Sequence, residues 1–127
     1  MKTKKPFFIV GSPRSGTTLL QAMLMSLDGV YIPPETKFWA ITAGRAGVFG
    51  PISSDKGFEL ALDEVLKSCP QNELPVDVAR LESELRAGVR DHGEMFDTLL
   101  NHMQQEKGCR RIGEKSRPHF PYVPQFI

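Results

Sequence analysis

Residues 6–27 read PFFIVGSPRSGTTLLQAMLMSL, and this stretch decides the fold of the chain. The apolar residues 7–10, ended by Gly11, predict a short strand that is buried on both faces of a parallel sheet. From residue 17 onward, apolar side chains recur at helical spacing and predict a helix that packs its apolar face on that sheet. These side chains are Leu19, Leu20, Met23, Leu24 and Leu27. Strand, loop and helix together predict half of a βαβ unit.

The loop at residues 11–18 reads GSPRSGTT and has the G-x-x-x-x-G frame of a phosphate-binding loop. Thr17 stands where the loops of ATP and GTP enzymes carry lysine, and Arg14 is the only cation inside the loop. Glycines let the backbone turn its N–H groups inward, and a helix start adds a positive dipole end. An ordinary turn with a hydroxyl N-cap is the alternative. The flanking strand and helix favour an anion site, with Arg14, Ser15, Thr17 and Thr18 as donors.

The composition fits one globular domain or part of one, with 127 residues, of which 40% are hydrophobic and 24% charged. A net charge of +1 argues against a general nucleic-acid-binding surface. Residues 7–10 are too short for the core of a signal peptide, and no apolar stretch reaches the length that spans a bilayer. We therefore expect a soluble, cytoplasmic protein.

The two cysteines, Cys69 and Cys109, stand without C-x-x-C spacing and without a nearby histidine cluster. This isolation argues against a disulfide framework and against a metal site. We predict that both thiols are reduced and structural, and we expect no bound metal.

Two further strands are predicted, and each leads into charged residues. Residues 30–32 form the first, which Pro33 and Pro34 close before Glu35, Thr36, Lys37, Phe38 and Trp39. The segment 109–116 predicts a strand that leads into a polar turn containing Glu114 and Lys115. In open α/β sheets, ligands bind at the carboxyl ends of the strands, so we expect the site at this edge.

The middle of the chain predicts helices without a chemical signature. Apolar side chains recur at helical spacing in residues 57–67, 78–89 and 95–107, and their charged residues predict solvated faces. Residues 44–51, rich in glycine, predict a loop that would serve as a flap. The expected fold is α/β, a P-loop-like three-layer arrangement with a parallel sheet flanked by helices. Because only three strands are predicted, we expect this fold to be incomplete.

Three segments resemble the sulfotransferases that use 3′-phosphoadenosine 5′-phosphosulfate (PAPS), namely PFFIVGSPRSGTTLL, PPETKFW and GEKSRPH. Within them, the chain is similar to the branch of protein-tyrosine sulfotransferases and many bacterial relatives. The resemblance implies that residues 1–127 are the N-terminal part of a single sulfotransferase domain with a helical insert at about 56–107. The family's second donor motif, whose Arg and Ser hold the 3′-phosphate, has no match here, which implies a fragment with half of the nucleotide site.

The resemblance also implies a role for each matching residue. Glu35 matches the acid of an E-T-R segment and would be the base that takes the proton from the acceptor hydroxyl, whereas Lys37 replaces the arginine of that segment. Lys115 resembles the family's lysine near the bridging oxygen of the donor. The loop that holds the 5′-phosphosulfate would consist of Arg14, Ser15, Gly16, Thr17 and Thr18, with Ser12 and Pro13 shaping its entry.

The implied reaction is in-line transfer of a sulfuryl group through a loose transition state, by analogy with phosphoryl transfer. Arg14, the loop amides and Lys115 would stabilise charge on the leaving oxygen. A sulfuryl group carries less charge than a phosphoryl group, so we expect no metal. The acceptor is a hydroxyl of a sugar, lipid, phenol, small metabolite or peptide tyrosine, and the sequence does not choose among them.

Several of these residues also have a structural interpretation. Glu35 is placed to cap a helix that begins near Lys37, since acids favour that end. Glu114 and Lys115 would alternatively be an exposed turn pair that contributes little.

Phe38, Trp39 and His119 also have structural interpretations, and two other functions stay open. Phe38 and Trp39 fit a core as well as an acceptor platform, and His119 fits an ordinary loop histidine. Two alternative functions stay open. One is a P-loop kinase or NTPase with a degenerate Walker A loop, and the other is a non-catalytic truncated product.

Overall fold

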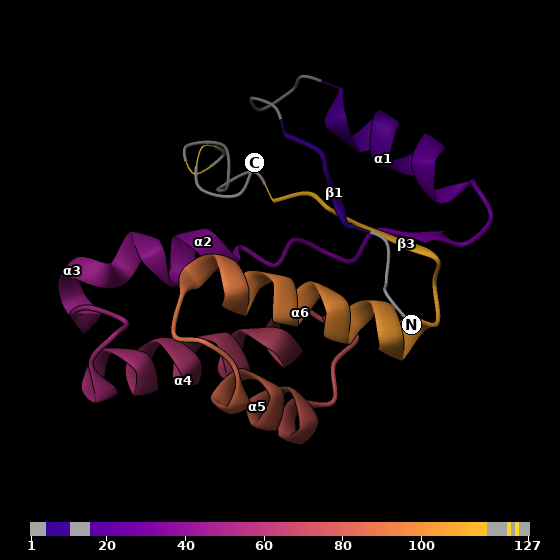
Figure 1. The fold of residues 1–127 in the computed structure, drawn as a ribbon. Helices are drawn as coiled ribbons and strands as arrows, with labels where there is room; N and C mark the ends of the chain where they lie inside the picture. The colour runs from indigo at the N-terminus through magenta and orange to yellow at the C-terminus, as the bar shows by residue number, and fades with distance from the viewer. Residues whose placement is uncertain (1–4, 11–15, 117–121, 123, 125–127) are drawn as a thin grey trace.

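The computed structural model of the chain describes residues 5–10, 16–116, 122 and 124. Its strands are β1 (Phe7–Phe8), β2 (Val30–Tyr31) and β3 (Arg111–Glu114). They pair in parallel in the order β1-β3-β2, so the strand that comes last in the sequence lies in the middle of the sheet. Because all three strands run in the same direction, their carboxyl ends meet at one edge of the sheet (Figure 1).

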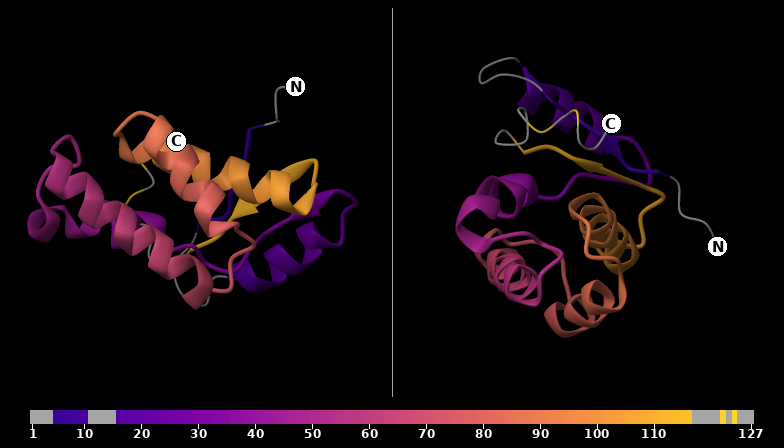
Figure 2. Two further views of the ribbon diagram at one scale, coloured as in Figure 1. Left: turned by 90° about the horizontal axis from the view of Figure 1, so that it is seen from below. Right: turned by 60° about the vertical axis from the view of Figure 1, so that its left-hand side comes forward.

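Helices cover both faces of this sheet (Figure 2). Helix α1 (Thr17–Met25) lies on one face, and α6 (His92–Lys107) lies on the other, where it contacts β3. The remaining helices lie on the side of α6; they are α2 (Phe38–Ile41), η1 (Ala43–Arg45), α3 (Ala46–Phe49), α4 (Asp55–Gln71) and α5 (Val78–Ala87). The predicted α/β fold, with a parallel sheet between helical layers, is confirmed.

The three long helices begin at side chains that accept a hydrogen bond from a backbone N–H of the first turn. Ser54 accepts from Gly57 N at 3.0 Å before α4, and Asp91 accepts from Glu94 N at 3.0 Å before α6. Asp77 serves α5 in the same way. These caps explain why α4 and α6 begin a few residues before their apolar periodicity does.

The hydrophobic core lies between these helices and the sheet, as the periodicity predicts. Its buried side chains include Phe58, Leu62 and Val65 of α4, Leu81 and Leu85 of α5, and Met95, Phe96, Leu99, Leu100 and Met103 of α6. Charged residues of the same helices pair on the surface, for example Arg86 with Glu59 at 2.6 Å. Such exposed pairs contribute little to stability, so the core holds the helical layer together.

Two sequence predictions are wrong. The apolar side of α1 is not packed on the sheet, because Leu19, Met23 and Leu27 are 67%, 60% and 55% exposed. Periodicity identifies which side of a helix is apolar, but another element must be present to cover it. The second error concerns residues 44–51, predicted as a loop, which form η1 and α3 instead. Gly50, with a φ of 86°, ends α3.

Both cysteines are free, as predicted. Cys69 is buried in α4, and burial raises its pKa to about 11. Burial also raises the pKa of Cys109, which is half-buried. Within the described ranges, no helix combines the length and the apolar character needed to cross a membrane.

Candidate functional site

The three segments that stand out in the sequence each follow the carboxyl end of a strand. β1 precedes the loop 11–18, β2 precedes the turn 33–37, and β3 is followed directly by Lys115. The last residue of β1, Phe8, pairs with Glu114 at the end of β3, and the last residue of β2, Tyr31, pairs with Ile112, two residues earlier in β3. This edge is where ligands of open α/β sheets bind.

Lys115 reaches the start of α1. Its Nζ donates a hydrogen bond to the hydroxyl of Thr18, in the first turn of the helix, at 3.4 Å. Gly16, the N-cap of α1, has a φ of 85°, a left-handed conformation that glycine adopts without steric cost. The ammonium group of Lys115 therefore lies beside a helix N-terminus, where both groups favour an anion.

Other predicted site residues lie outside the described residues. These are Ser12, Pro13, Arg14, Ser15 and His119, and of Thr17 the backbone alone is described.

Glu114, the last residue of β3, is buried, with 2% of its surface exposed. Its Oε1 accepts a hydrogen bond from Thr36 Oγ1 at 2.8 Å and another from the hydroxyl of Ser116. A buried carboxylate needs such donors because it has lost its hydration. The alternative in which Glu114 belongs to an exposed turn pair is therefore wrong.

The same hydroxyls hold the turn that carries Glu35. The backbone N–H of Lys37 donates to Ser116 Oγ at 3.0 Å, and the N–H of Phe38 donates to Thr36 Oγ1 at 3.3 Å. Thr36 thus accepts from the first N–H of α2. Glu35 itself is half-buried.

Phe38 and Trp39 belong to the core, and their interpretation as an acceptor platform is wrong. Phe38 is fully buried and Trp39 is 3% exposed. The Phe38 ring stacks on Phe96 of α6 with 5.1 Å between centroids, and Trp39 meets the same ring edge-on at 5.8 Å. Phe96 also stacks on Phe8 of β1. Aromatic packing therefore anchors the turn 33–37 to the helical layer and, through Phe96, to β1.

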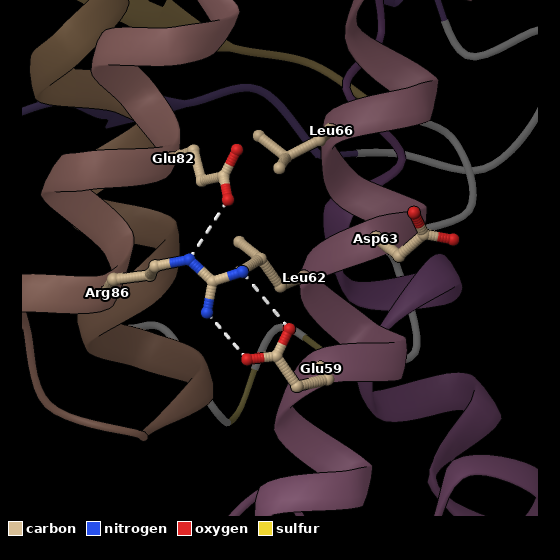
Figure 3. A pocket seen from close by; sticks show the side chains of 6 residues that line it. All are labelled: Glu59, Leu62, Asp63, Leu66, Glu82 and Arg86. Atoms are coloured by element: carbon tan, nitrogen blue, oxygen red, sulfur yellow. Dashed lines mark hydrogen bonds and ion pairs between the residues drawn. The ribbon is translucent and has the colours of Figure 1, made fainter.

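A pocket between α4 and α5 is the alternative place for a ligand, and Figure 3 shows the side chains that line it. Arg86 points into it and donates to Glu59 at 2.6 and 3.1 Å and to Glu82 at 3.0 Å. These hydrogen bonds raise the pKa of Arg86, so its guanidinium is charged and already paired with two carboxylates. With Asp63 as a third acid, the lining repels a phosphate or sulfate. Its remaining lining residues are Leu62 and Leu66.

Sequence reasoning missed the buried group formed by Thr36, Glu114 and Ser116. Each hydroxyl residue directly follows a residue that the resemblance marks, Glu35 in one case and Lys115 in the other. The sequence signal for this group was that a charged residue is followed by a hydroxyl residue in both places. The burial of Glu114 could not be predicted from the sequence, because it depends on β3 being the central strand. Among the described residues, no cluster of three or more His, Cys, Asp or Glu side chains is arranged to hold a metal ion.

Comparison with known families matches residues 6–126 to a family model described as "Sulfotransferase family". The match covers almost the whole chain and includes all three strand-end segments. No curated protein and no solved structure matches the chain.

Proposed function

The chain belongs to the sulfotransferase family, and on that premise we propose that it transfers a sulfuryl group from PAPS to a hydroxyl acceptor. The observation that carries this proposal is the contact between Lys115 and Thr18. This contact brings the ammonium group of Lys115, which follows β3, next to the N-terminus of α1. A sulfated nucleotide is a ligand that such a pair would bind.

The donor is assigned to the loop 11–18 and Lys115. Ser12, Pro13, Arg14, Ser15, Gly16, Thr17 and Thr18 would hold the 5′-phosphosulfate through backbone N–H groups, hydroxyls and one guanidinium. Lys115 would lie near the oxygen that bridges sulfur and phosphorus. In this arrangement the ammonium group stabilises the negative charge that grows on that oxygen as its bond to sulfur breaks.

The acceptor is assigned to the turn after β2, with Glu35 as general base. Glu35 takes the proton of the acceptor hydroxyl while the acceptor oxygen forms a bond to sulfur in line with the leaving oxygen. The products are a sulfate ester and adenosine 3′,5′-bisphosphate. The geometry supports this role because hydrogen bonds from Thr36 and Lys37 tie the turn to the same strand end that carries Lys115. The acceptor class comprises sugars, lipids, phenols, small metabolites and peptide tyrosines.

We assign residues 1–127 to the N-terminal part of one sulfotransferase domain, the part that binds the 5′-phosphosulfate, with α4 to α6 as a helical insert. The exposed apolar side of α1 supports this assignment. Leu19 and Met23 are at least 60% exposed, and contiguous exposed apolar side chains are typical of surfaces that other protein segments cover.

Transfer of radiolabelled sulfate from PAPS to a panel of hydroxyl acceptors tests the proposal. We expect Glu35→Gln to lower kcat by about 100-fold or more, because the amide cannot take the proton, while donor affinity stays nearly constant. Glu82→Gln on α5 is the matched control and should leave kcat unchanged. A Glu35→Gln variant whose kcat stays close to the wild-type value would show that another group is the base.

A further inference from the structure

We propose that Glu114 is a positioning residue whose buried carboxylate sets the Glu35 turn in place against Lys115. This inference rests on the proposed function and adds to it a residue that touches neither donor nor acceptor. Glu114, Thr36, Ser116 and the N–H of Lys37 are hereafter called the carboxylate latch.

The direction of each hydrogen bond in the latch follows from the chemistry of its groups. A backbone N–H can only donate, so the oxygens of Ser116 and Thr36 accept from the turn, and each hydroxyl gives its single proton to Glu114 Oε1. The lone pairs of those hydroxyl oxygens then face the backbone. Ser116 Oγ accepts from the N–H of Lys37, and Thr36 Oγ1 accepts from the N–H of Phe38. Glu114 therefore orients both hydroxyls as acceptors for the turn.

The latch holds Lys37 in a backbone conformation that the turn would otherwise leave. Lys37 has a φ of 55°, in the left-handed region that is sterically unfavourable for a residue with a Cβ atom. Its side chain is exposed, whereas its N–H is held by Ser116 at 3.0 Å. Residues in such conformations persist where the surroundings determine them, and here the latch supplies that constraint.

Glu114 and Lys115 are consecutive residues at the end of the central strand, and they serve opposite sides of it. Glu114 reaches the turn after β2 through Thr36, and Lys115 reaches the start of α1 through Thr18. A shift of either contact changes the separation between the proposed base and the proposed donor site. A displacement of about 1 Å is enough to slow an in-line transfer by roughly 100-fold.

Thr36→Val is the most specific test, because it removes both hydrogen bonds of one hydroxyl and keeps the shape of the side chain. Thr42→Val is its matched control. Thr42 is as buried as Thr36 and is the residue that follows α2, but its hydroxyl donates to the Phe38 carbonyl rather than to Glu114. We expect Thr36→Val to lower kcat about tenfold or more, with the dissociation constant for adenosine 3′,5′-bisphosphate changed less than about twofold. Thr42→Val should change neither.

Glu114→Gln and Glu114→Ala separate hydrogen bonding from charge. The Oε1 of glutamine still accepts from both hydroxyls, so we expect Glu114→Gln to keep kcat within a few-fold, whereas Glu114→Ala loses at least as much as Thr36→Val. Equal losses in the two variants would overturn a positioning role. If Glu114→Ala fails to fold, Thr36→Val and Thr42→Val carry the test, with thermal unfolding as the check on folding.

The rate of amide hydrogen exchange at Lys37 in the free protein tests whether its N–H is held by the latch, and it does so without turnover. We expect faster exchange in Thr36→Val than in wild type and no change in Thr42→Val. Unchanged exchange and unchanged kcat in Thr36→Val would overturn the inference. A wild-type protein without sulfuryl transfer would overturn the proposed function and Glu114's catalytic relevance, even where the exchange pattern shows that the latch exists.

Discussion

Gly113 lies in the middle strand at a point where no side chain fits. A Cβ atom at this position would lie 2.3 Å from Cε2 of Phe7 and 3.0 Å from Cγ1 of Ile32. Phe7 pairs with Gly113 in the neighbouring strand, and its ring covers the space above the glycine. The close approach matters for the site because Glu114 and Lys115 follow directly.

We therefore expect Gly113→Ala to lower the free energy of unfolding by about 1–3 kcal/mol, the usual cost of overpacking. Gly47→Ala is the matched control, since Gly47 lies in the short helix α3 with nothing within 4 Å of the added Cβ. It should raise the free energy of unfolding by no more than about 1 kcal/mol, because alanine favours the helix and no neighbour is displaced. Urea denaturation of the three proteins measures the difference, and a Gly113→Ala variant as stable as wild type would contradict the packing at this strand pair.

At the scale of single residues, the sequence predicts the identity of site residues better than their surroundings. Glu35 and Lys115 stand out by their place after strands and by the family resemblance. The burial of Glu114 does not, because a carboxylate beside a lysine most often forms an exposed pair. Its environment arises when two segments 78 positions apart in sequence come together, as the Thr36–Glu114 hydrogen bond illustrates.

Among the elements, β3 organises the site because it lies between β1 and β2. Parallel strands need crossover connections, which α1 provides between β1 and β2 and the helices α2 to α6 provide between β2 and β3. The strands and the three long helices were predictable from apolar runs and periodicity. The strand order was not, because three short apolar runs are compatible with more than one order.

Helix α1 shows the limit of periodicity most directly, and a matched pair of leucines tests it. Leu19 of α1 is 67% exposed, whereas Leu99 of α6 is 2% exposed. We expect Leu19→Ala to change the free energy of unfolding by no more than about 0.5 kcal/mol, and Leu99→Ala to lower it by about 2–5 kcal/mol. Denaturant unfolding measures both, and a large loss in Leu19→Ala would mean that the apolar side of α1 is covered in solution.

At the scale of the whole molecule, the helical layer acts as a platform for the sheet edge. The rings of Phe8, Phe96 and Phe38 stack in turn, so that β1, α6 and α2 share one aromatic column. The turn with Glu35 immediately precedes α2, and the latch fixes its other side. Aromatic packing in the core therefore holds the turn with Glu35 on one side, and the hydrogen bonds of the latch hold it on the other.

The most direct test of this account asks where a nucleotide binds. Backbone amide resonances of the isotope-labelled protein are followed during titration with adenosine 3′,5′-bisphosphate without magnesium and, separately, with ATP and magnesium. We expect the bisphosphate to give the larger response, centred on Gly16, Thr18 and Lys115. Shifts centred on the pocket around Arg86, or a stronger response to ATP with magnesium, would contradict the account.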